Sequence, residues 1–213
     1  MYIPEHFSIK DQATLYDWIE RWSFGNLITS HRGRIEANQV PFLLDRDSNT
    51  LLGHVAKANR HWMALLNAED LLVQFNGPHA YVSPDWYSQP DGVPTWNYVS
   101  VQVRGKAELV KTESDALQLL RRLTNTNEAL YGPGWRMEDM DQSRLKGLLQ
   151  AIVCFRIHIT AIEGKAKLSQ NRSKMDRVGV ARELSASEDS GQQELARLMM
   201  QDLRQRKSNP EPQ

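Results

Sequence analysis

Three polar side chains stand close together where a strand pattern gives way to a helix pattern. Lys57, Asn59 and Arg60 lie in the run Gly53–Trp62 and bring an ammonium, an amide and a guanidinium group into one short turn. Such donors suit a phosphate group, and the free N–H groups at a helix start would add to them. An ordinary solvated turn with surface cations is the alternative interpretation.

A second polar cluster follows the best strand pattern of the chain, inside the basic stretch 165–177. Lys167, Ser169, Gln170 and Asn171 combine a cation with neutral hydrogen-bonding groups. This combination could bind a phosphorylated ligand. A basic segment is also commonly a solvated face, so both interpretations stay open.

An aromatic-rich stretch leads into the longest strand pattern. Trp96, Asn97 and Tyr98 begin that strand, and His79 and Tyr81 precede it. Trp and Tyr rings stack on planar ligands, and an Asn amide can bind the edge of a heterocycle. Aromatic residues in strands also fill cores. The stretch therefore predicts either one wall of a ligand site or a plug at the end of a β-barrel.

Composition excludes several classes of site. The 213 residues carry 26 Lys plus Arg and 26 Asp plus Glu, so any nucleic-acid contact must be a local patch. The single cysteine, Cys154, allows no intrachain disulfide and no thiolate zinc site. Glycine-rich phosphate loops, nucleophile elbows and His-Glu-x-x-His pairs are absent, and we expect no metal site. With no membrane-length apolar run and no signal-peptide pattern, we expect a cytoplasmic protein and no membrane partner.

The elements that would position these residues are mostly strands. Apolar periodicity predicts helices over 11–22, 58–69, 112–124 and 143–149. Extended patterns predict strands over 26–30, 35–44, 50–57, 71–75, 96–110 and 151–162. Because few helices separate the strands, the fold class is mainly β with some α, an antiparallel barrel with peripheral helices. A sandwich is the competing architecture.

Two segments are expected to depart from this pattern. Over 77–95 we expect a loop with a short strand at 80–83, because four prolines (Pro78, Pro84, Pro90 and Pro94) lack the N–H that a strand interior uses. Beyond 185 the chain becomes polar. An amphipathic helix is predicted over 192–207 and a disordered end over 208–213.

Several uncommon runs resemble one known family. They are Met1–Pro4, Pro41–Asp45, Leu52–Asn59 with Trp62, Phe75–Pro84, Val93–Tyr98 and Lys167–Arg172. In order and composition they resemble the PaiB-type FMN-binding negative transcriptional regulators, over almost the whole chain up to about residue 185. Two positions depart from that family. Lys57 stands in place of an arginine, which keeps the charge but loses the bidentate fork, and His61 stands in place of a glutamine.

The resemblance implies an FMN-binding split β-barrel of the pyridoxamine-phosphate oxidase type over 1–184, followed by a helical and partly disordered tail over 185–213. It also implies a homodimer with FMN between the subunits, and it favours the phosphate interpretation of Lys57 and Asn59. By region, 35–44 and 53–59 would line the flavin, and 96–98 with 167–172 would close the site from the same or the partner subunit. The implied cofactor-binding residues are Asn38, Gln39, His54, Val55, Lys57, Asn59, Trp96, Asn97, Tyr98, Lys167, Ser169, Gln170 and Asn171.

Two functions are compatible with this resemblance. The family name implies a negative transcriptional regulator, for which only the basic stretch 165–177 offers a candidate DNA contact. The alternative is a flavin-dependent oxidoreductase, or a haem-degrading split-barrel enzyme, that uses FMN and a reduced nicotinamide. In that case His79, Tyr81, Trp96 and Tyr98 would shape a substrate pocket. No residue pair demands acid–base chemistry, so no catalytic residue is predicted and enzymatic activity stays open.

Overall fold

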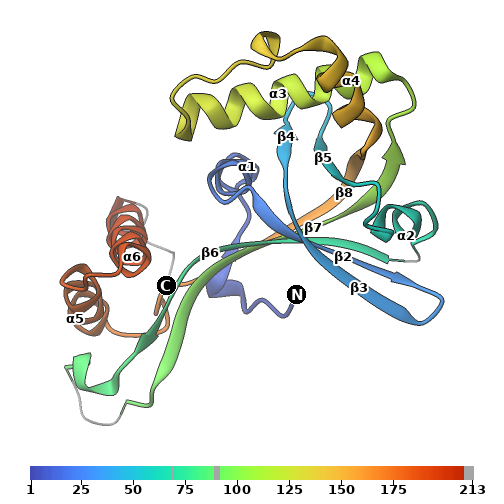
Figure 1. Cartoon of the computed structure of the whole chain (residues 1–213). Coiled ribbons are helices and arrows are strands. Elements are labelled where there is room, and N and C mark those ends of the chain that lie inside the picture. Colours follow the sequence, from blue (N-terminus) through green and yellow to red (C-terminus); the bar gives the residue numbers. More distant parts are fainter. Residues whose placement is uncertain (69, 89–91, 209–213) are drawn as a thin grey trace. The chain divides into compact units, whose positions relative to one another are not determined.

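The computed structural model describes residues 1–68, 70–88 and 92–208 (Figure 1). These residues form two compact units, each assembled from separate stretches of the chain. Unit 1 comprises Met1–Asp11, Asn76–Val101 and the described residues from Glu163 onward. Unit 2 comprises Gln12–Phe75 and Gln102–Ile162.

Within the described residues, eight strands form one sheet in the order β3-β2-β6-β7-β8-β5-β4, and β1 pairs with β8. Long strands β6, β7 and β8 contribute residues to both units. The bounds are β1 Ser8–Ile9, β2 Phe24–His31, β3 Arg34–Pro41, β4 Leu43–Asp45, β5 Thr50–Ala56, β6 Asp70–Val82, β7 Thr95–Leu109 and β8 Ile152–Lys167.

Helices flank the strands, and all of them except Lys174–Ser185 lie where a helix was predicted. They are α1 Gln12–Arg21, α2 His61–Asn67, α3 Glu113–Tyr131, α4 Gln142–Gln150, α5 Lys174–Ser185 and α6 Ser190–Ser208, with 3-10 turns at Glu5–Phe7, Pro84–Trp86 and Met137–Asp139. Helix α3 begins at the predicted cap, because the Thr112 side chain accepts a 3.1 Å hydrogen bond from the Asp115 N–H. It continues past the predicted end at 124 to Tyr131.

Unit 2 contains a sheet that closes on itself. Strand β3 is one edge of the strand order, yet it contacts β5, next to the other edge. The interior is aromatic: the Phe42 ring lies 5.7 Å from Phe75 and 6.3 Å from Phe155, centroid to centroid. Gly53 on β5 makes room for this packing, because a Cβ there would lie 2.9 Å from Cζ of Phe155.

The outer face of β5 and β8 is covered by α3. Leu52 and Cys154 of the two strands pack against Leu119 and Leu123 of the helix. Burial raises the pKa of the Cys154 thiol to about 11. The only cysteine of the chain is therefore a core residue and offers no nucleophile at neutral pH.

The predicted loop over 77–95 is wrong in its first part. Strand β6 continues through Pro78 to Val82, so the connection to β7 is only the segment 83–94, in which 89–91, with Pro90, lie outside the described residues. Pro78, Ala80 and Val82 are all buried on the same strand face. A strand tolerates proline where its missing N–H is not needed by the ladder, and here the alternating burial outweighs the proline signal.

In unit 1, the predicted end of the last strand is wrong. Strand β8 does not end near 162 but continues to Lys167, where Ser8 of β1 pairs with Lys165. Helices α5 and α6 lie side by side, and the predicted amphipathic helix over 192–207 is present as α6, with Leu195 and Met199 buried (Figure 1). The predicted disordered end lies, from 209 to 213, outside the described residues, and the domain boundary at 184 stays a prediction.

None of the helices in the described ranges combines the length and apolar character that a membrane span requires.

Candidate functional site

An open groove of about 340 Å³ lies in unit 2 beside β3 and the start of α2. We call it the β3–α2 groove. It brings together Asn38 and Asn59, two of the residues that the sequence implied for the cofactor. Its lining residues are Arg34, Ile35, Glu36, Ala37, Asn38, Asn59, Arg60 and His61.

His61 organises the floor of this groove. Its side chain is 1% exposed, and both ring nitrogens are engaged: Nε2 lies 2.8 Å from Thr29 Oγ1, and Nδ1 lies 2.7 Å from Asn38 Nδ2. The His61 backbone N–H donates to Asn59 Oδ1 at 3.1 Å, which forms a small side-chain turn before α2. This N–H is therefore already used and is not one of the free donors that the sequence suggested.

The hydrogen bonds determine the tautomer of His61. With the amide nitrogen of Asn38 placed beside Nδ1, Nδ1 accepts from Asn38, and Nε2 carries the proton that it donates to Thr29 Oγ1. Burial lowers the pKa of His61, and the charge of Glu36 only partly opposes this effect. The imidazole is accordingly neutral at pH 7.

The charges around the groove favour an anion. The Nε atom of Arg34 lies 3.8 Å from Oε1 of Glu36, and the Arg60 side chain is exposed. Among the described residues the Arg60 guanidinium and the Lys57 ammonium make no hydrogen bond or ion pair. The described lining of the groove therefore contains two guanidinium groups and two side-chain amides but only one carboxylate. This set of hydrogen-bond donors fits a phosphate monoester.

Lys57 is held beside this groove by its backbone. Its N–H donates to the Ala151 carbonyl at 2.8 Å, and its own carbonyl accepts from Trp62 Nε1 at 3.1 Å. The side chain is exposed but does not line the groove. Its contact with a ligand stays a prediction.

Three other implied residues of unit 2 lie away from the groove. Gln39 follows Asn38 on β3 and so faces the opposite side of the strand. Val55 is buried in the core, whereas His54 faces the other way, with a buried Nδ1 that has no partner in the described part of the chain. Burial lowers the pKa of His54. Their roles in binding stay predictions.

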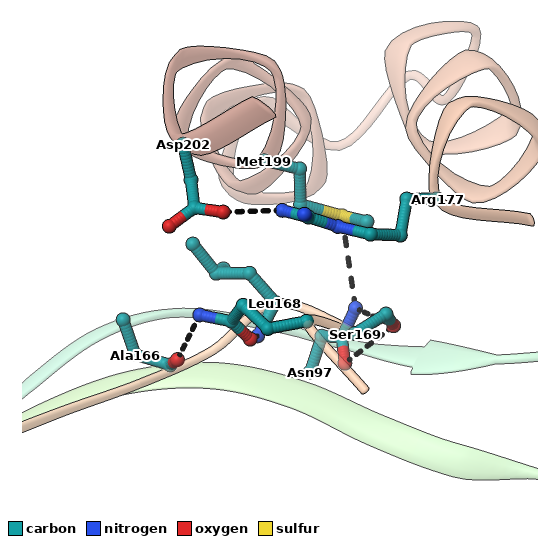
Figure 2. A network of polar contacts seen from close by, with 8 residues as sticks. Asn97, Ala166, Leu168, Ser169, Arg177, Met199 and Asp202 are labelled. Atoms are coloured by element: carbon teal, nitrogen blue, oxygen red, sulfur yellow. Dashed lines mark hydrogen bonds and ion pairs between the residues drawn. The ribbon is translucent and has the colours of Figure 1, made fainter. Parts of the chain in front are cut away.

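In unit 1 the implied residues form a polar network inside the protein (Figure 2). Asn97 is fully buried, and its Nδ2 donates to Ser169 Oγ at 2.9 Å and to Met199 Sδ at 3.6 Å. Ser169 Oγ donates back to Asn97 Oδ1 at 3.2 Å, from a backbone with a positive φ of 61°. These bonds fasten α6 to the strand ends, so both groups of the Asn97 amide are already satisfied.

The neighbouring polar side chains also serve the chain itself. Gln170 bonds the Leu168 N–H and the Ala166 carbonyl, each at 2.7 Å. Lys167 donates to Thr95 Oγ1 and, at 2.8 Å, to the Trp96 carbonyl. Burial, and then the charge of Lys165, lowers the pKa of Lys167. Asn171 is exposed and has no side-chain hydrogen bond within the described residues.

The aromatic stretch of unit 1 lies at the surface. Trp96 is 53% exposed and Tyr81 47% exposed, with their rings edge to face at 6.0 Å. The exposed His79 ring lies 6.2 Å from Trp96. Tyr98 is half-buried, with the Lys165 ammonium 5.2 Å from its ring centroid. Trp96 and Tyr81 therefore present a wall of rings and do not plug a core.

The basic stretch 165–177 is largely engaged within unit 1. Lys165 is 7% exposed and donates to the Tyr2 carbonyl at 3.1 Å. Arg177 is 4% exposed and forms an ion pair with Asp202 (Figure 2). The Arg172 guanidinium lies 4.7 Å from the Tyr87 ring centroid. Most of the cations that make this stretch basic are therefore not free for a phosphate backbone.

Sequence reasoning missed Arg34 and His61 as parts of the groove, and Thr29 as the partner of His61 Nε2. In the sequence, His61 stands out only as a departure from the family pattern. The available signal was Asn59 two residues ahead of it, the spacing of a side-chain turn. Thr29 and Arg34 gave no local signal, because only the β2–β3 hairpin and the packing of α2 on β2 bring them near His61.

Known proteins resemble this chain in sequence and in fold. Residues 1–161 match the family described as "Putative FMN-binding domain". The chain is 33% identical over 207 residues to the protease synthase and sporulation protein PAI 2 of Bacillus subtilis (strain 168), covering 96% of this chain and 99% of that protein. It is 30% identical over 184 residues to an uncharacterized protein of Emericella nidulans, covering 68% and 73%.

Two solved structures share the fold at low sequence identity. The flavocytochrome Anf3 of Azotobacter vinelandii aligns with a TM-score of 0.62 at 17% identity, over 82% of this chain and 77% of that one. An FAD and haem binding protein of Mycobacterium smegmatis aligns with a TM-score of 0.59 at 15% identity, over 81% and 79%. The predicted split-barrel fold is confirmed. The family match confirms FMN as the cofactor, and the chain belongs to this FMN-binding family.

Proposed function

We propose that this protein holds the phosphate of FMN in the β3–α2 groove and acts as a negative regulator of transcription. The groove is the observation that carries the binding proposal, because its guanidinium and amide groups suit a phosphate monoester. The regulatory part rests on the resemblance to the PaiB-type regulators. The Bacillus relative, which matches this chain nearly end to end, has a name that refers to protease synthesis and sporulation.

The chemistry of the groove follows from charge. A phosphate monoester carries a charge of about −1.5 to −2 at neutral pH. Arg34 and Arg60 line the groove and can form charge-assisted hydrogen bonds to it, and Lys57 adds a third cation nearby. FMN, when bound, supplies electron-transfer chemistry, while the protein supplies binding and orientation.

Titration of FMN by the quenching of its fluorescence tests this proposal. Arg60→Ala and Lys57→Ala should each weaken FMN binding about tenfold, since each removes one charge-assisted contact. Lys111→Ala, an exposed cation just before α3, is the matched control and should bind like the wild type. If Arg60→Ala, the variant that lines the groove, binds like the control, the phosphate does not lie in this groove. If only Lys57→Ala binds like the control, Lys57 does not contact the phosphate.

The resemblance also implies a homodimer, and exposed apolar side chains support it. Ile35 is 73% exposed and Phe24 58% exposed on the β2–β3 hairpin, whose outer strand is a sheet edge. Apolar side chains on an edge are what a second copy would cover. Light scattering after size exclusion should give twice the chain mass. A folded monomer at low concentration would argue against the homodimer.

Regulation by direct contact with DNA has a simple test. If the protein binds DNA itself, a gel shift at low salt should show it, and affinity should fall steeply as salt rises. The zero net charge and the internal use of Lys165 and Arg177 favour an indirect route. No shift at low salt would exclude direct repression.

A flavin-dependent oxidoreductase is the second candidate, and the exposed rings of His79, Tyr81 and Trp96 favour it. Such rings can stack on a planar substrate. NADH or NADPH should then bleach the absorbance of the FMN-loaded protein. Absence of bleaching by both nicotinamides would leave the regulator as the better interpretation.

A further inference from the structure

The Asn38 amide presents two different groups, and only one of them is used inside the protein. Its Nδ2 donates to His61 Nδ1 at 2.7 Å. Its Oδ1 accepts no hydrogen bond from any described residue, although the half-buried side chain lines the β3–α2 groove. The carbonyl of this amide is therefore the group that remains available to a ligand.

His61 decides which end of the amide is available. A neutral imidazole with its proton on Nε2 can accept only through Nδ1, so it selects the nitrogen of Asn38. A protonated imidazole donates from both nitrogens. Asn38 would then have to turn its Oδ1 toward His61 and present its NH₂ group to the groove.

The surroundings of His61 keep this arrangement well defined. From β2 the ring meets the neutral hydroxyl of Thr29, and His31 at the end of that strand bonds the Asn67 carbonyl of α2. The charged groups that face it across the groove are Glu36 and Arg34 of β3 and Arg60 ahead of α2. No carboxylate within the described residues bonds the ring directly, so no hydrogen-bonded partner favours the imidazolium.

We propose that His61 is a positioning residue of the FMN site: its neutral ring fixes the Asn38 amide so that Oδ1 accepts a hydrogen bond from a hydroxyl group of the ligand next to the phosphate. This inference rests on the proposed function. It defines the ligand class as a phosphate monoester of a polyol, such as the ribityl phosphate of FMN. Inorganic phosphate lacks that hydroxyl and should bind more weakly.

The first experiment examines the protein without ligand. In ¹⁵N spectra of the histidine rings, His61 should show a protonated Nε2 and an unprotonated Nδ1 at neutral pH. Asn38→Ala should shift the Nδ1 signal, because it removes the only donor to that atom among the described residues. An Nδ1–H tautomer, or an Nδ1 signal that Asn38→Ala does not move, would overturn the inference without using FMN.

The second experiment measures the dissociation constant of FMN against pH. His61→Leu cannot accept from Asn38 and should bind FMN about tenfold more weakly at neutral pH. His61→Gln keeps an acceptor oxygen and should bind within about twofold of the wild type, since its amide replaces the accepting ring nitrogen. His31→Gln is the matched control, a histidine on the same hairpin whose loss should change nothing.

The pH profile separates positioning from a merely structural role. A phosphate monoester itself titrates near pH 6, so the His61→Gln profile is the baseline. As the pH falls, the FMN affinity of the wild type should decrease more than that of His61→Gln, because protonation of His61 turns the Asn38 amide so that its NH₂ group faces the groove. Identical profiles for the wild type and His61→Gln would overturn the inference while leaving the proposed function intact. If the wild type binds no FMN at any pH, the proposed function fails, and the inference with it.

Discussion

Two asparagines, Asn38 in unit 2 and Asn97 in unit 1, show how differently one residue type can be used. Both were implied as cofactor ligands, and both form hydrogen-bonded networks with neighbours distant in sequence. Asn97 is fully buried, and Ser169 and Met199 satisfy its amide. Asn38 is half-buried, and one side of its amide has no partner among the described residues.

The difference teaches what separates a binding amide from a structural one. A buried amide whose donors and acceptor are all paired contributes stability and has nothing left for a ligand. An amide that is fixed on one side and free on the other is oriented in advance, which lowers the entropy lost on binding. Burial and hydrogen-bond satisfaction make this distinction, and residue type does not.

The largest expected effect is in unit 1, on stability. Asp202→Ala should lower the free energy of unfolding by about 3 kcal/mol, because it leaves the nearly buried Arg177 guanidinium without its counter-charge. Urea denaturation measures the loss. Adding Arg177→Met to Asp202→Ala should recover part of it, and Glu188→Ala is the exposed control. No recovery in the double variant would show that the loss does not come from an unpaired charge.

Asn97→Ala should lower the free energy of unfolding by a smaller amount, about 2 kcal/mol, because it leaves the Ser169 hydroxyl unpaired and opens a small cavity. The FMN affinity of the folded protein should stay unchanged. Asn125→Ala, an exposed asparagine on α3, is the control for both measurements. A large loss of FMN affinity in Asn97→Ala would place Asn97 in the site and remove the contrast with Asn38.

Asn38→Ala should give the reverse result. FMN affinity should fall about tenfold, while the free energy of unfolding should fall by only about 1 kcal/mol, since the side chain is half-exposed. Fluorescence titration and urea denaturation on the same samples test both numbers. An Asn38→Ala variant that is as destabilised as Asn97→Ala but binds FMN normally would make Asn38 a structural residue.

The smallest effect is on the pH dependence of stability. Burial lowers the pKa values of His54 and His61 from 6.5 in the folded state, so the unfolded chain binds more protons just below pH 6.5. The stability that the two neutral histidines contribute is therefore fully present above pH 6.5. It decreases as the pH falls toward the lowered pKa values, and the free energy of unfolding then changes by less than about 1.4 kcal/mol per pH unit for each proton. Urea denaturation between about pH 7 and about pH 5 should show this decrease, and His61→Gln should make it shallower. An equal slope in both proteins would mean that His61 does not titrate in this way.

Local signals predicted many elements of the fold. The Thr112 cap marked the start of α3, and the alternation around Phe155 marked β8. Local signals gave the wrong strand ends where burial or strand pairing in the sheet extends a strand. Proline at 78 predicted a loop, but burial on alternate positions carries β6 through it. Strand β8 extends to Lys167 because it pairs with β1, which lies far away in the sequence.

For the candidate site, the sequence by itself determined the family, the cofactor class and the run that holds Lys57 and Asn59, because those depend on residue types and their order. Only the tertiary structure decided which of the implied residues meet. Strand pairing and the packing of α2 bring Asn38, His61 and Thr29 together, whereas the packing of α6 uses up the amide of Asn97. The physical reason is that hydrogen-bond satisfaction and burial are set by neighbours distant in the chain, which no local pattern specifies.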